Sequence, residues 1–270
     1  MSNAGVITES IDFGVCRLSM VPVRSEASDR SELVTQLLFG EHYEVLLESK
    51  DKKWLKIRIH FDQYEGWMDA TQHHTISKEH FEYINRVDFK ITTDITTSIL
   101  YNKNPLTIVM GSIIPISGTE LFKMEEQFAF NGESKSMGVK RDAEFLKVTA
   151  QRYLNAPYLW GGKSPFGIDC SGFTQMVFKI GGYKLSRDSV QQAKQGKAIQ
   201  FKDSVPGDLA FFKNKENKIS HVGIILSDDR VIHASGKVRI DHLNEEGILH
   251  SERKTYTHQL SSIRRILPDG

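Results

Sequence analysis

The sequence predicts an α+β domain that is preceded by two small all-β barrels. The N-terminal half consists of short strand-like segments separated by turns, whereas the C-terminal half has two helical patterns followed by consecutive strand-like segments. The length of 270 residues also exceeds the roughly 100–200 residues of a typical domain. We therefore expect domains at residues 1–72, 73–139 and 140–270.

The first expected barrel is built from strand-like segments at residues 15–23, 33–39, 42–48, 54–59 and 66–69. Polar Lys56 and Arg58 alternate with apolar neighbours, as in a strand with one buried face. Strands this short with regular turns are typical of a small barrel. The Gly40-Glu41 turn, the Trp54-Leu55-Lys56-Ile57 strand and the Tyr64-Glu65-Gly66-Trp67 segment resemble a bacterial SH3-like domain.

Residues 76–138 are again strand-like, with many Ile and Thr between Asn, Gly and Pro turns. We expect a second, more divergent SH3-like barrel here, and a decorated linker is the alternative.

The pattern changes at Asp142, where a helix is predicted and is stopped by Asn155-Ala156-Pro157. A second helix is predicted from Ser171 or Gly172 to the Gly181-Gly182 pair, because apolar residues recur in it at helical spacing. Strands are expected at residues 208–212, 221–226 and 230–234. Helices followed by consecutive strands indicate a mostly antiparallel sheet.

Composition disfavours several classes of protein. A net charge of +1 without a dense Lys/Arg block gives no reason to expect nucleic acid as a partner. The apolar runs are far shorter than the roughly 20 residues of a membrane span, and no obligate protein partner is indicated. No secretory leader is visible at residues 1–14, which leaves the cytoplasm, or the periplasm or cell envelope after leader removal, as expected compartments.

Cys170 is the candidate nucleophile. It lies in Asp169-Cys170-Ser171-Gly172-Phe173 at a predicted helix start, where the helix dipole favours thiolate over thiol. A strand at residues 221–226 offers His221 as a base, with Gly223 on the same face leaving room for substrate or for Cys170. If the next strand is its neighbour, His233 can orient the His221 ring, which gives the nucleophile, base and orienting group of a thiol hydrolase.

Simpler interpretations of these residues exist. A lone cysteine is usually a buried apolar side chain, and we interpret Cys16 in that way. Two cysteines cannot build a disulfide framework, although a single Cys16–Cys170 disulfide stays open. Histidines on strands are often structural, and a zinc site made of Cys170, His221 and His233 is a further alternative.

Residues 142–270 resemble the NlpC-type cell-wall peptidases, a papain-like family that acts on γ-D-glutamyl bonds. The matching segments, in chain order, are Ala156-Pro157-Tyr158-Leu159-Trp160-Gly161-Gly162, Gly167-Ile168-Asp169-Cys170-Ser171-Gly172-Phe173, Arg187-Asp188-Ser189-Val190-Gln191-Gln192, Pro206-Gly207-Asp208-Leu209-Ala210-Phe211-Phe212, His221-Val222-Gly223-Ile224 and Ile232-His233-Ala234. The resemblance implies that Cys170 is the nucleophile, His221 its base and His233 the residue that orients the base. It implies no metal or other cofactor.

The same resemblance implies further substrate contacts. Asp169 would place a negative charge for a substrate ammonium, or cap the following helix, and both roles are compatible. Asp188 and Ser189 would line the pocket with Ser171, and Trp160 would form a wall. The Cys170 backbone N–H would hold the developing oxyanion, with Tyr158 as a second donor.

The whole-chain order is similar to the γ-D-glutamyl-L-diamino acid peptidases of murein-peptide recycling. In those enzymes the first SH3-like domain blocks one end of the cleft and admits a short peptide with a free N-terminal L-alanine. Glu32 and Tyr64 are the matching residues here, with a solvated barrel surface as the simpler interpretation. The expected substrate is a murein tripeptide cut between D-Glu and meso-diaminopimelate or L-lysine. Alternatives are an autolysin of intact wall, an inactive wall-binding protein and an acyl- or amidotransferase.

Overall fold

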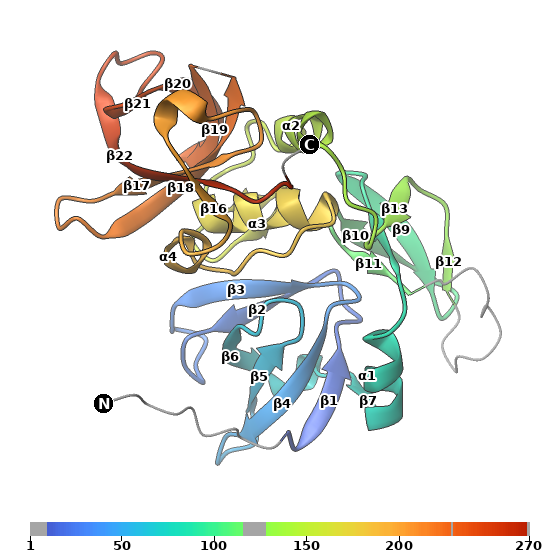
Figure 1. The fold of residues 1–270 in the computed structure, drawn as a ribbon. Coiled ribbons are helices and arrows are strands. Elements are labelled where there is room, and N and C mark those ends of the chain that lie inside the picture. Colours follow the sequence, from blue (N-terminus) through green and yellow to red (C-terminus); the bar gives the residue numbers. More distant parts are fainter. Residues whose placement is uncertain (1–9, 116–127, 228, 269–270) are drawn as a thin grey trace.

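The computed structural model describes residues 10–115, 128–227 and 229–268. Figure 1 shows a blue N-terminal barrel, a smaller group of green strands and a yellow-to-red C-terminal part. Helix α3 (Cys170–Ile180) lies where these three parts meet.

The N-terminal barrel is an antiparallel sheet in the order β3-β2-β6-β5-β4-β1-β7. In β5, Leu55, Ile57 and Ile59 enter the core, whereas Lys56 and Arg58 pair with Glu65 outside it. The predicted alternation is therefore confirmed. The strands are β1 (Asp12–Val15), β2 (Met20–Arg24), β3 (Leu33–Leu38), β4 (His42–Glu48), β5 (Trp54–Ile59), β6 (Glu65–Asp69) and β7 (Thr75–Ile76).

The single strand predicted at residues 15–23 was wrong, because the structure divides it into the end of β1 and all of β2. The Cys16 N–H donates to the Glu41 carbonyl at 2.8 Å, and the Gly40 N–H donates to the Cys16 carbonyl at 2.8 Å. These two bonds hold residues 16–19 at the Gly40-Glu41 turn and end the first strand.

The middle part contains two three-stranded antiparallel sheets, β10-β9-β12 and β11-β8-β13. Strands thus lie where the sequence predicted them, and a second SH3-like barrel stays a prediction. The elements are η1 (Ala70–Gln72), α1 (Lys78–Ile84), β8 (Lys90–Thr92), β9 (Thr96–Tyr101), β10 (Asn104–Val109), β11 (Ile113–Ile114), β12 (Phe128–Phe130) and β13 (Ser134–Ser136).

Helix α1 was missed by the strand-like interpretation of residues 76–138. Ser77 caps it by accepting a hydrogen bond from the His80 N–H, and Phe81 and Ile84 are its buried residues. The Phe81 ring packs 4.7 Å from the Phe13 ring of the first barrel. Packing against that barrel stabilises a helix too short to form by itself.

The C-terminal part carries its sheet in the order β16-β22-β17-β18-β19-β20-β21, and an added β21–β22 pairing closes β17 to β22 into a barrel. All of its pairings are antiparallel, as predicted. The elements are α2 (Ala143–Gln151), β14 (Lys163–Ser164), β15 (Gly167–Ile168), α3, α4 (Ser189–Gln192), β16 (Lys197–Ile199), η2 (Phe201–Asp203), β17 (Leu209–Lys213), β18 (Ile219–Ser227), β19 (Arg230–Ser235), β20 (Lys237–Asn244), β21 (Gly247–Leu249) and β22 (Tyr256–Arg265).

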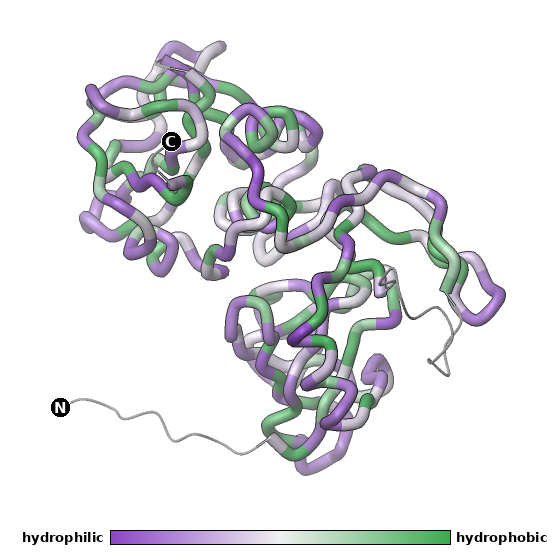
Figure 2. The backbone as a smooth tube through the Cα atoms, turned by 45° about the vertical axis from the view of Figure 1, so that its right-hand side comes forward, coloured by the Kyte–Doolittle hydropathy of each residue, from purple (hydrophilic) through white to green (hydrophobic). Residues whose placement is uncertain are grey.

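Helix α3 is the centre of the main core, and all of its residues are buried. Its Phe173 and Met176 pack with Val222 and Ile224 of β18, whereas Ile225 of β18 faces the separate core inside the barrel. Figure 2 shows green hydrophobic stretches among purple hydrophilic ones in all three parts of the chain. In the part of the chain that the structure describes, no helix is long and apolar enough to cross a membrane.

Candidate active site

Cys170 is the first residue of α3 and is 7% exposed. Asp169 immediately precedes it and caps the helix, because its Oδ1 accepts a hydrogen bond of 2.6 Å from the Gly172 N–H. The Val222 backbone N–H contacts the thiol, which places Cys170 beside β18 at the residue that follows His221. The helix start therefore holds the nucleophile candidate against the strand that carries the base candidate.

The resting thiol is protonated in this environment. Burial, followed by the Asp169 carboxylate, raises the pKa of the Cys170 thiol to about 12, although the Val222 N–H and Arg187 act in the opposite direction. The expectation that the helix end favours thiolate was wrong for this state, because desolvation of the anion exceeds the dipole effect. Deprotonation of this thiol thus needs a base in contact with it.

A chain of hydrogen bonds begins at the His221 imidazole. His221 Nε2 lies 2.8 Å from His233 Nδ1, and His233 Nε2 lies 3.1 Å from Asp241 Oδ2. The two strands are neighbours as predicted, with Gly223 opposite His233. A Cβ on Gly223 would approach Val231 Cγ2 to 2.7 Å and His233 Cβ to 3.0 Å. The missing side chain thus makes room for Val231 and His233, and not for substrate or Cys170 as we had expected.

The chain fixes where the protons lie. Burial alone would raise the pKa of Asp241, but hydrogen bonds from His233, Ser251 and Arg239 lower it, so the carboxylate is ionised. The carboxylate accepts a hydrogen bond from His233 Nε2, which therefore carries the ring's proton. Nδ1 of the neutral His233 ring is then left to accept a hydrogen bond from His221 Nε2. Burial, followed by the neighbouring His233 and His258, holds the pKa of His221 well below 6.5. His221 therefore has a free lone pair at Nδ1.

Two residues of this cluster were missed by the sequence reasoning. Asp241 lies on β20, opposite Val231 of β19, and His258 of β22 stacks on His221 with ring centroids 4.1 Å apart. Both strands lay beyond the segments predicted as strands. The sequence offered only a weak signal for Asp241, which shares one face of β20 with Leu243, and both side chains are buried.

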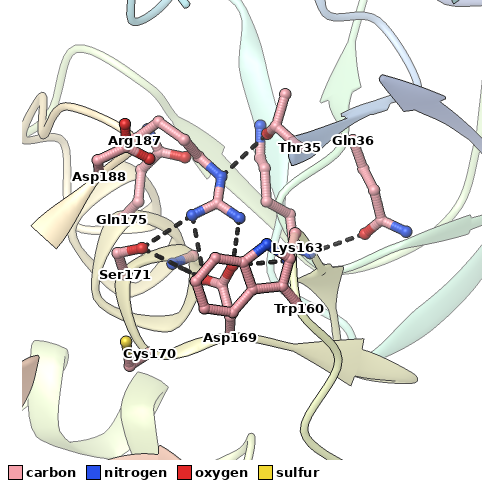
Figure 3. Close-up of polar contacts among 12 residues, drawn as sticks. Thr35, Gln36, Trp160, Lys163, Asp169, Cys170, Ser171, Gln175, Arg187 and Asp188 are labelled. Carbon is pink, nitrogen blue, oxygen red and sulfur yellow. Dashed lines mark hydrogen bonds and ion pairs between the residues drawn. The ribbon is translucent and has the colours of Figure 1, made fainter. Parts of the chain in front are cut away.

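Asp169 has a different electrostatic role from the one predicted. Arg187 donates to both of its oxygens, at 3.0 Å and 2.6 Å, and the Gly161 N–H donates to Oδ2 at 2.8 Å. Arg187 is 1% exposed and also donates to Ser171 Oγ at 2.9 Å. Figure 3 shows this guanidinium between Asp169 and Thr35, above the Cys170 sulfur. The Asp169 charge is thus compensated by Arg187, a residue to which the sequence analysis had given no role.

A cavity of about 620 Å³ opens at Cys170. It brings together all the predicted substrate-binding residues, from both the first barrel and the C-terminal part: Glu32, Tyr64, Trp160, Asp169, Ser171, Asp188 and Ser189, with Tyr158 also in the lining. Trp160 Nε1 donates to Glu32 Oε1 at 2.5 Å, so a hydrogen bond joins the first barrel to the C-terminal part at this cavity.

Tyr64 and Asp188 form a second contact across this junction. Asp188 lines the cavity as predicted from the resemblance, and it also begins α4 as its N-cap. Burial, then the Asp188 charge, raises the pKa of Tyr64 to about 12, and a hydrogen bond joins the two side chains. Burial also raises the pKa of Asp188.

The structure leaves one predicted contact unmade. Among the hydrogen bonds of the described residues, none joins the Cys170 thiol to His221, and the acid–base pairing stays a prediction. In the same part of the chain no three His, Cys, Asp or Glu residues are placed to hold a metal ion together. Both cysteines are free thiols, and Cys16 lies in the first barrel's core, which excludes the Cys16–Cys170 disulfide.

Comparison with known proteins supports the same architecture. The NlpC/P60 family matches residues 155–256, and the bacterial dipeptidyl-peptidase Sh3 domain matches residues 23–72. The gamma-D-glutamyl-L-lysine dipeptidyl-peptidase of Bacillus subtilis (strain 168) is 32% identical over 74% of this chain and 71% of its own length. The chain belongs to the NlpC/P60 family of cysteine peptidases.

Other NlpC/P60 relatives extend over the N-terminal parts as well. The gamma-D-glutamyl-L-lysine dipeptidyl-peptidase of Bacillus cereus (strain ATCC 10987 / NRS 248) is 28% identical over 89% of this chain and 77% of its own length. A solved NlpC/P60 family protein from Bacillus cereus ATCC 10987 aligns with a TM-score of 0.79 and 22% identity, covering 95% of this chain and all of that one. The fold is therefore shared across the whole chain.

Proposed function

We propose that this NlpC/P60 peptidase hydrolyses the bond between γ-D-glutamate and an L-diamino acid in murein peptides with a free N-terminal L-alanine. The observation that carries the proposal is that Glu32 and Tyr64 of the first barrel line the same cavity as Cys170. The Glu32–Trp160 hydrogen bond supports a blocked end at this side, where we expect only a short acyl segment to fit beyond the nucleophile. The names of the two Bacillus relatives describe the same bond with L-lysine as the diamino acid.

The charge distribution in the cavity suits a substrate ammonium. Asp169 is paired with Arg187, whereas Glu32 contacts only the neutral indole of Trp160 among the described residues. Asp188, with a neutral Tyr64 beside it, is the second acceptor at this end. We therefore assign the ammonium to Glu32 and Asp188. Asp169 and Ser171 position Arg187, and Ser189 lines the cavity wall.

The proposed reaction proceeds through a thioester. Cys170 Sγ attacks the γ-carbonyl carbon while His221 Nδ1 takes the thiol proton, and the oxyanion forms near the Cys170 N–H and Tyr158. His221 then gives this proton to the departing amine of the diamino acid as the C–N bond breaks. Water attacks the thioester, His221 takes one proton from it, and the returning proton regenerates the Cys170 thiol. His233 and Asp241 hold the His221 ring in one tautomer throughout.

The test is incubation of the full-length protein with free tripeptide, N-acetylated tripeptide and intact sacculi, followed by mass spectrometry. Acetylation removes the cation and leaves the carboxylates unpaired, so we expect a loss of at least about a hundredfold in kcat/KM. Equal cleavage of the free and acetylated peptides contradicts the proposal. Release of soluble fragments from sacculi supports the autolysin instead.

Two variants test the nucleophile. Cys170→Ala removes the attacking sulfur, and we expect no turnover with a nearly unchanged melting temperature. Cys16→Ala is the matched control, because Cys16 is equally buried but lies in the first barrel's core. Turnover that survives in Cys170→Ala refutes the mechanism.

A third comparison separates the base from the residue that orients it. His221→Ala removes the proton acceptor, whereas His233→Ala only frees the ring of His221, so we expect the second variant to retain more activity. A larger loss for His233→Ala in single-turnover kinetics would reverse the two roles.

A further inference from the structure

A second cavity of about 800 Å³ lies beside the one described above. Ser220, the residue before His221, lines both cavities, so the two meet at the base. From there the second cavity passes over His258, which stacks on His221. It is an open groove across the mouth of the C-terminal barrel, and its lining is Lys213, Asn214, Lys215, Ser220, Glu245, Glu246, Tyr256, Thr257, His258, Gln259 and Leu260.

The walls of the groove carry opposite charges. Lys213 and Lys215 come from the end of β17 and the turn after it, whereas Glu245 and Glu246 form the turn between β20 and β21. Within residues 10–115, 128–227 and 229–268, the side chains of these four residues make no hydrogen bond or ion pair. The Tyr256 hydroxyl, also in the lining, accepts a hydrogen bond of 2.6 Å from Asn244 Nδ2. The groove thus offers unpaired cations on one wall and unpaired anions on the other.

The position of the groove relative to His221 decides what it can bind. In the proposed reaction His221 gives its proton to the departing amine, so the departing residue lies on the His221 side of the nucleophile. The acyl segment then lies on the other side, toward Glu32 and Trp160. A departing diamino acid carries an ammonium on its side chain and a carboxylate on its main chain, which is the charge pattern of the two walls.

We propose that this groove is the leaving-group site, in which Glu245 and Glu246 bind the side-chain ammonium and Lys213 and Lys215 bind the carboxylate of the diamino acid. The inference rests on the proposed function and extends it to the specificity for the departing residue. His258 forms the floor between the base and the groove, where it separates the His221 ring from solvent.

The experiment measures kcat/KM of the full-length protein for two peptides, L-Ala-γ-D-Glu-L-Lys and its L-norleucine analogue, which lacks only the ε-ammonium. We expect the wild type to prefer the lysine peptide by about three- to tenfold, because partly exposed charge pairs are worth up to roughly 1 kcal/mol each. The Glu245→Gln/Glu246→Gln double variant should lose this preference and cut both peptides at the norleucine rate.

A control variant lies on the same face. Glu216→Gln removes an exposed carboxylate from the turn between β17 and β18, where Glu216 pairs with Lys218 at 2.9 Å outside the groove lining. This variant should keep the wild-type preference. In the second arm, Lys213→Gln/Lys215→Gln should weaken cleavage of the free-acid peptide about three- to tenfold and leave its C-terminal amide unchanged.

The outcomes separate the two proposals. Equal cleavage of the lysine and norleucine peptides by both wild type and the glutamate double variant overturns the groove inference and leaves the proposed function standing. Cleavage of neither peptide by the wild type overturns both. A meso-diaminopimelate peptide in the same assay shows which diamino acid the walls favour, because its side chain adds a second carboxylate for the lysines.

Discussion

The two β-rich parts that precede the peptidase domain contact helix α3 in different ways. The first barrel meets this helix and the segments that flank it through buried polar and charged groups: Glu41 bonds Lys163 and Lys179, at 3.1 Å and 2.6 Å, and Thr35 Oγ1 accepts from Arg187 at 3.1 Å. Of these partners, Lys179 belongs to the helix itself. The middle part meets it mainly through apolar packing, with Val109 and Met110 in the main core beside Met176. The first barrel also lines the Cys170 cavity, whereas none of the described strands of the middle part does.

The difference suggests a division of roles. A buried ion network is directional, so it sets the position of the first barrel relative to the nucleophile helix and thereby places Glu32 and Tyr64. Apolar packing of the middle part supports the same helix without specifying a ligand contact. The predictions below test this division, from the largest expected effect to the smallest.

The strongest test is Glu41→Gln. Glu41 and both of its lysine partners are fully buried, and burial alone would raise the pKa of Glu41, but Lys163 and Lys179 lower it to about 2. Removing the charge leaves two buried ammonium groups without a counterion, and we expect a loss of about 3–5 kcal/mol in the free energy of unfolding by denaturant titration. The control Glu65→Gln, at a surface pair, should cost less than about 1 kcal/mol. Similar costs for the two variants would contradict an interface held by buried charge.

Glu32→Gln tests recognition without disturbing the fold. Glu32 is exposed and its described side-chain bond is to Trp160, so we expect an unchanged melting temperature. The kcat/KM for the free tripeptide should fall about tenfold or more, because a hydrogen bond to a charged group is worth about 1.5–3 kcal/mol. An unchanged kcat/KM would show that the first barrel contributes shape and not charge.

Gly111→Ala makes the opposite change, in the middle part. Gly111 has φ +91°, and a Cβ there would lie 2.0 Å from Met176 Cε. We expect a loss of about 1–3 kcal/mol in the free energy of unfolding with kcat/KM of the folded fraction unchanged. Gly236→Ala is the matched control, since its φ is +71° and no atom lies within 4 Å of the added Cβ. A fall in kcat/KM for Gly111→Ala larger than its stability loss explains would give the middle part a role in catalysis.

The first barrel and the middle part should also differ in how the free energy of unfolding depends on pH, because the middle strands β8–β13 contain no histidine. In the first barrel, burial and then the charge of the stacked His60 lower the pKa of His42 to about 4. His42 is therefore protonated near pH 6.5 in the unfolded chain but only near pH 4 in the folded chain. The free energy of unfolding keeps the full contribution of neutral His42 above pH 6.5 and loses it as the pH falls from 6.5 toward 4. His42→Gln should reduce the slope of stability against pH by up to about 1.4 kcal/mol per pH unit. Parallel profiles for the variant and the wild type would contradict this assignment.

The interface also changes how the domain roles can be tested. Deleting residues 1–72 would strip Glu41 from Lys163 and Lys179, and Gln36 from the Lys163 N–H to which it bonds at 2.7 Å. The peptidase domain would then expose buried charges, so point substitutions such as Glu32→Gln are the sharper experiment.

The sequence determined those features whose signal is local. The order Asp169-Cys170 before an apolar helical pattern predicted a capped helix with the thiol at its start, and the α3 bounds agree to within two residues. The strands that carry His221 and His233 were both expected from the sequence, and the observed pairing of Gly223 with His233 places both rings on one face. The period of two residues in a strand, or of 3.6 in a helix, fixes which side chains share a face. This can be read from the segment itself, without knowing its packing partners.

Only the tertiary structure decided which charges are paired in the site and how its side chains are arranged in space. Arg187 neutralises Asp169, Asp241 holds His233, and His258 stacks on His221, each from a different segment of the chain. The raised pKa of Cys170 likewise comes from burial by the surrounding parts, which outweighs the helix end that the sequence displays. Desolvation and ion pairing depend on which segments pack together, and periodicity carries no information about partners beyond the segment itself.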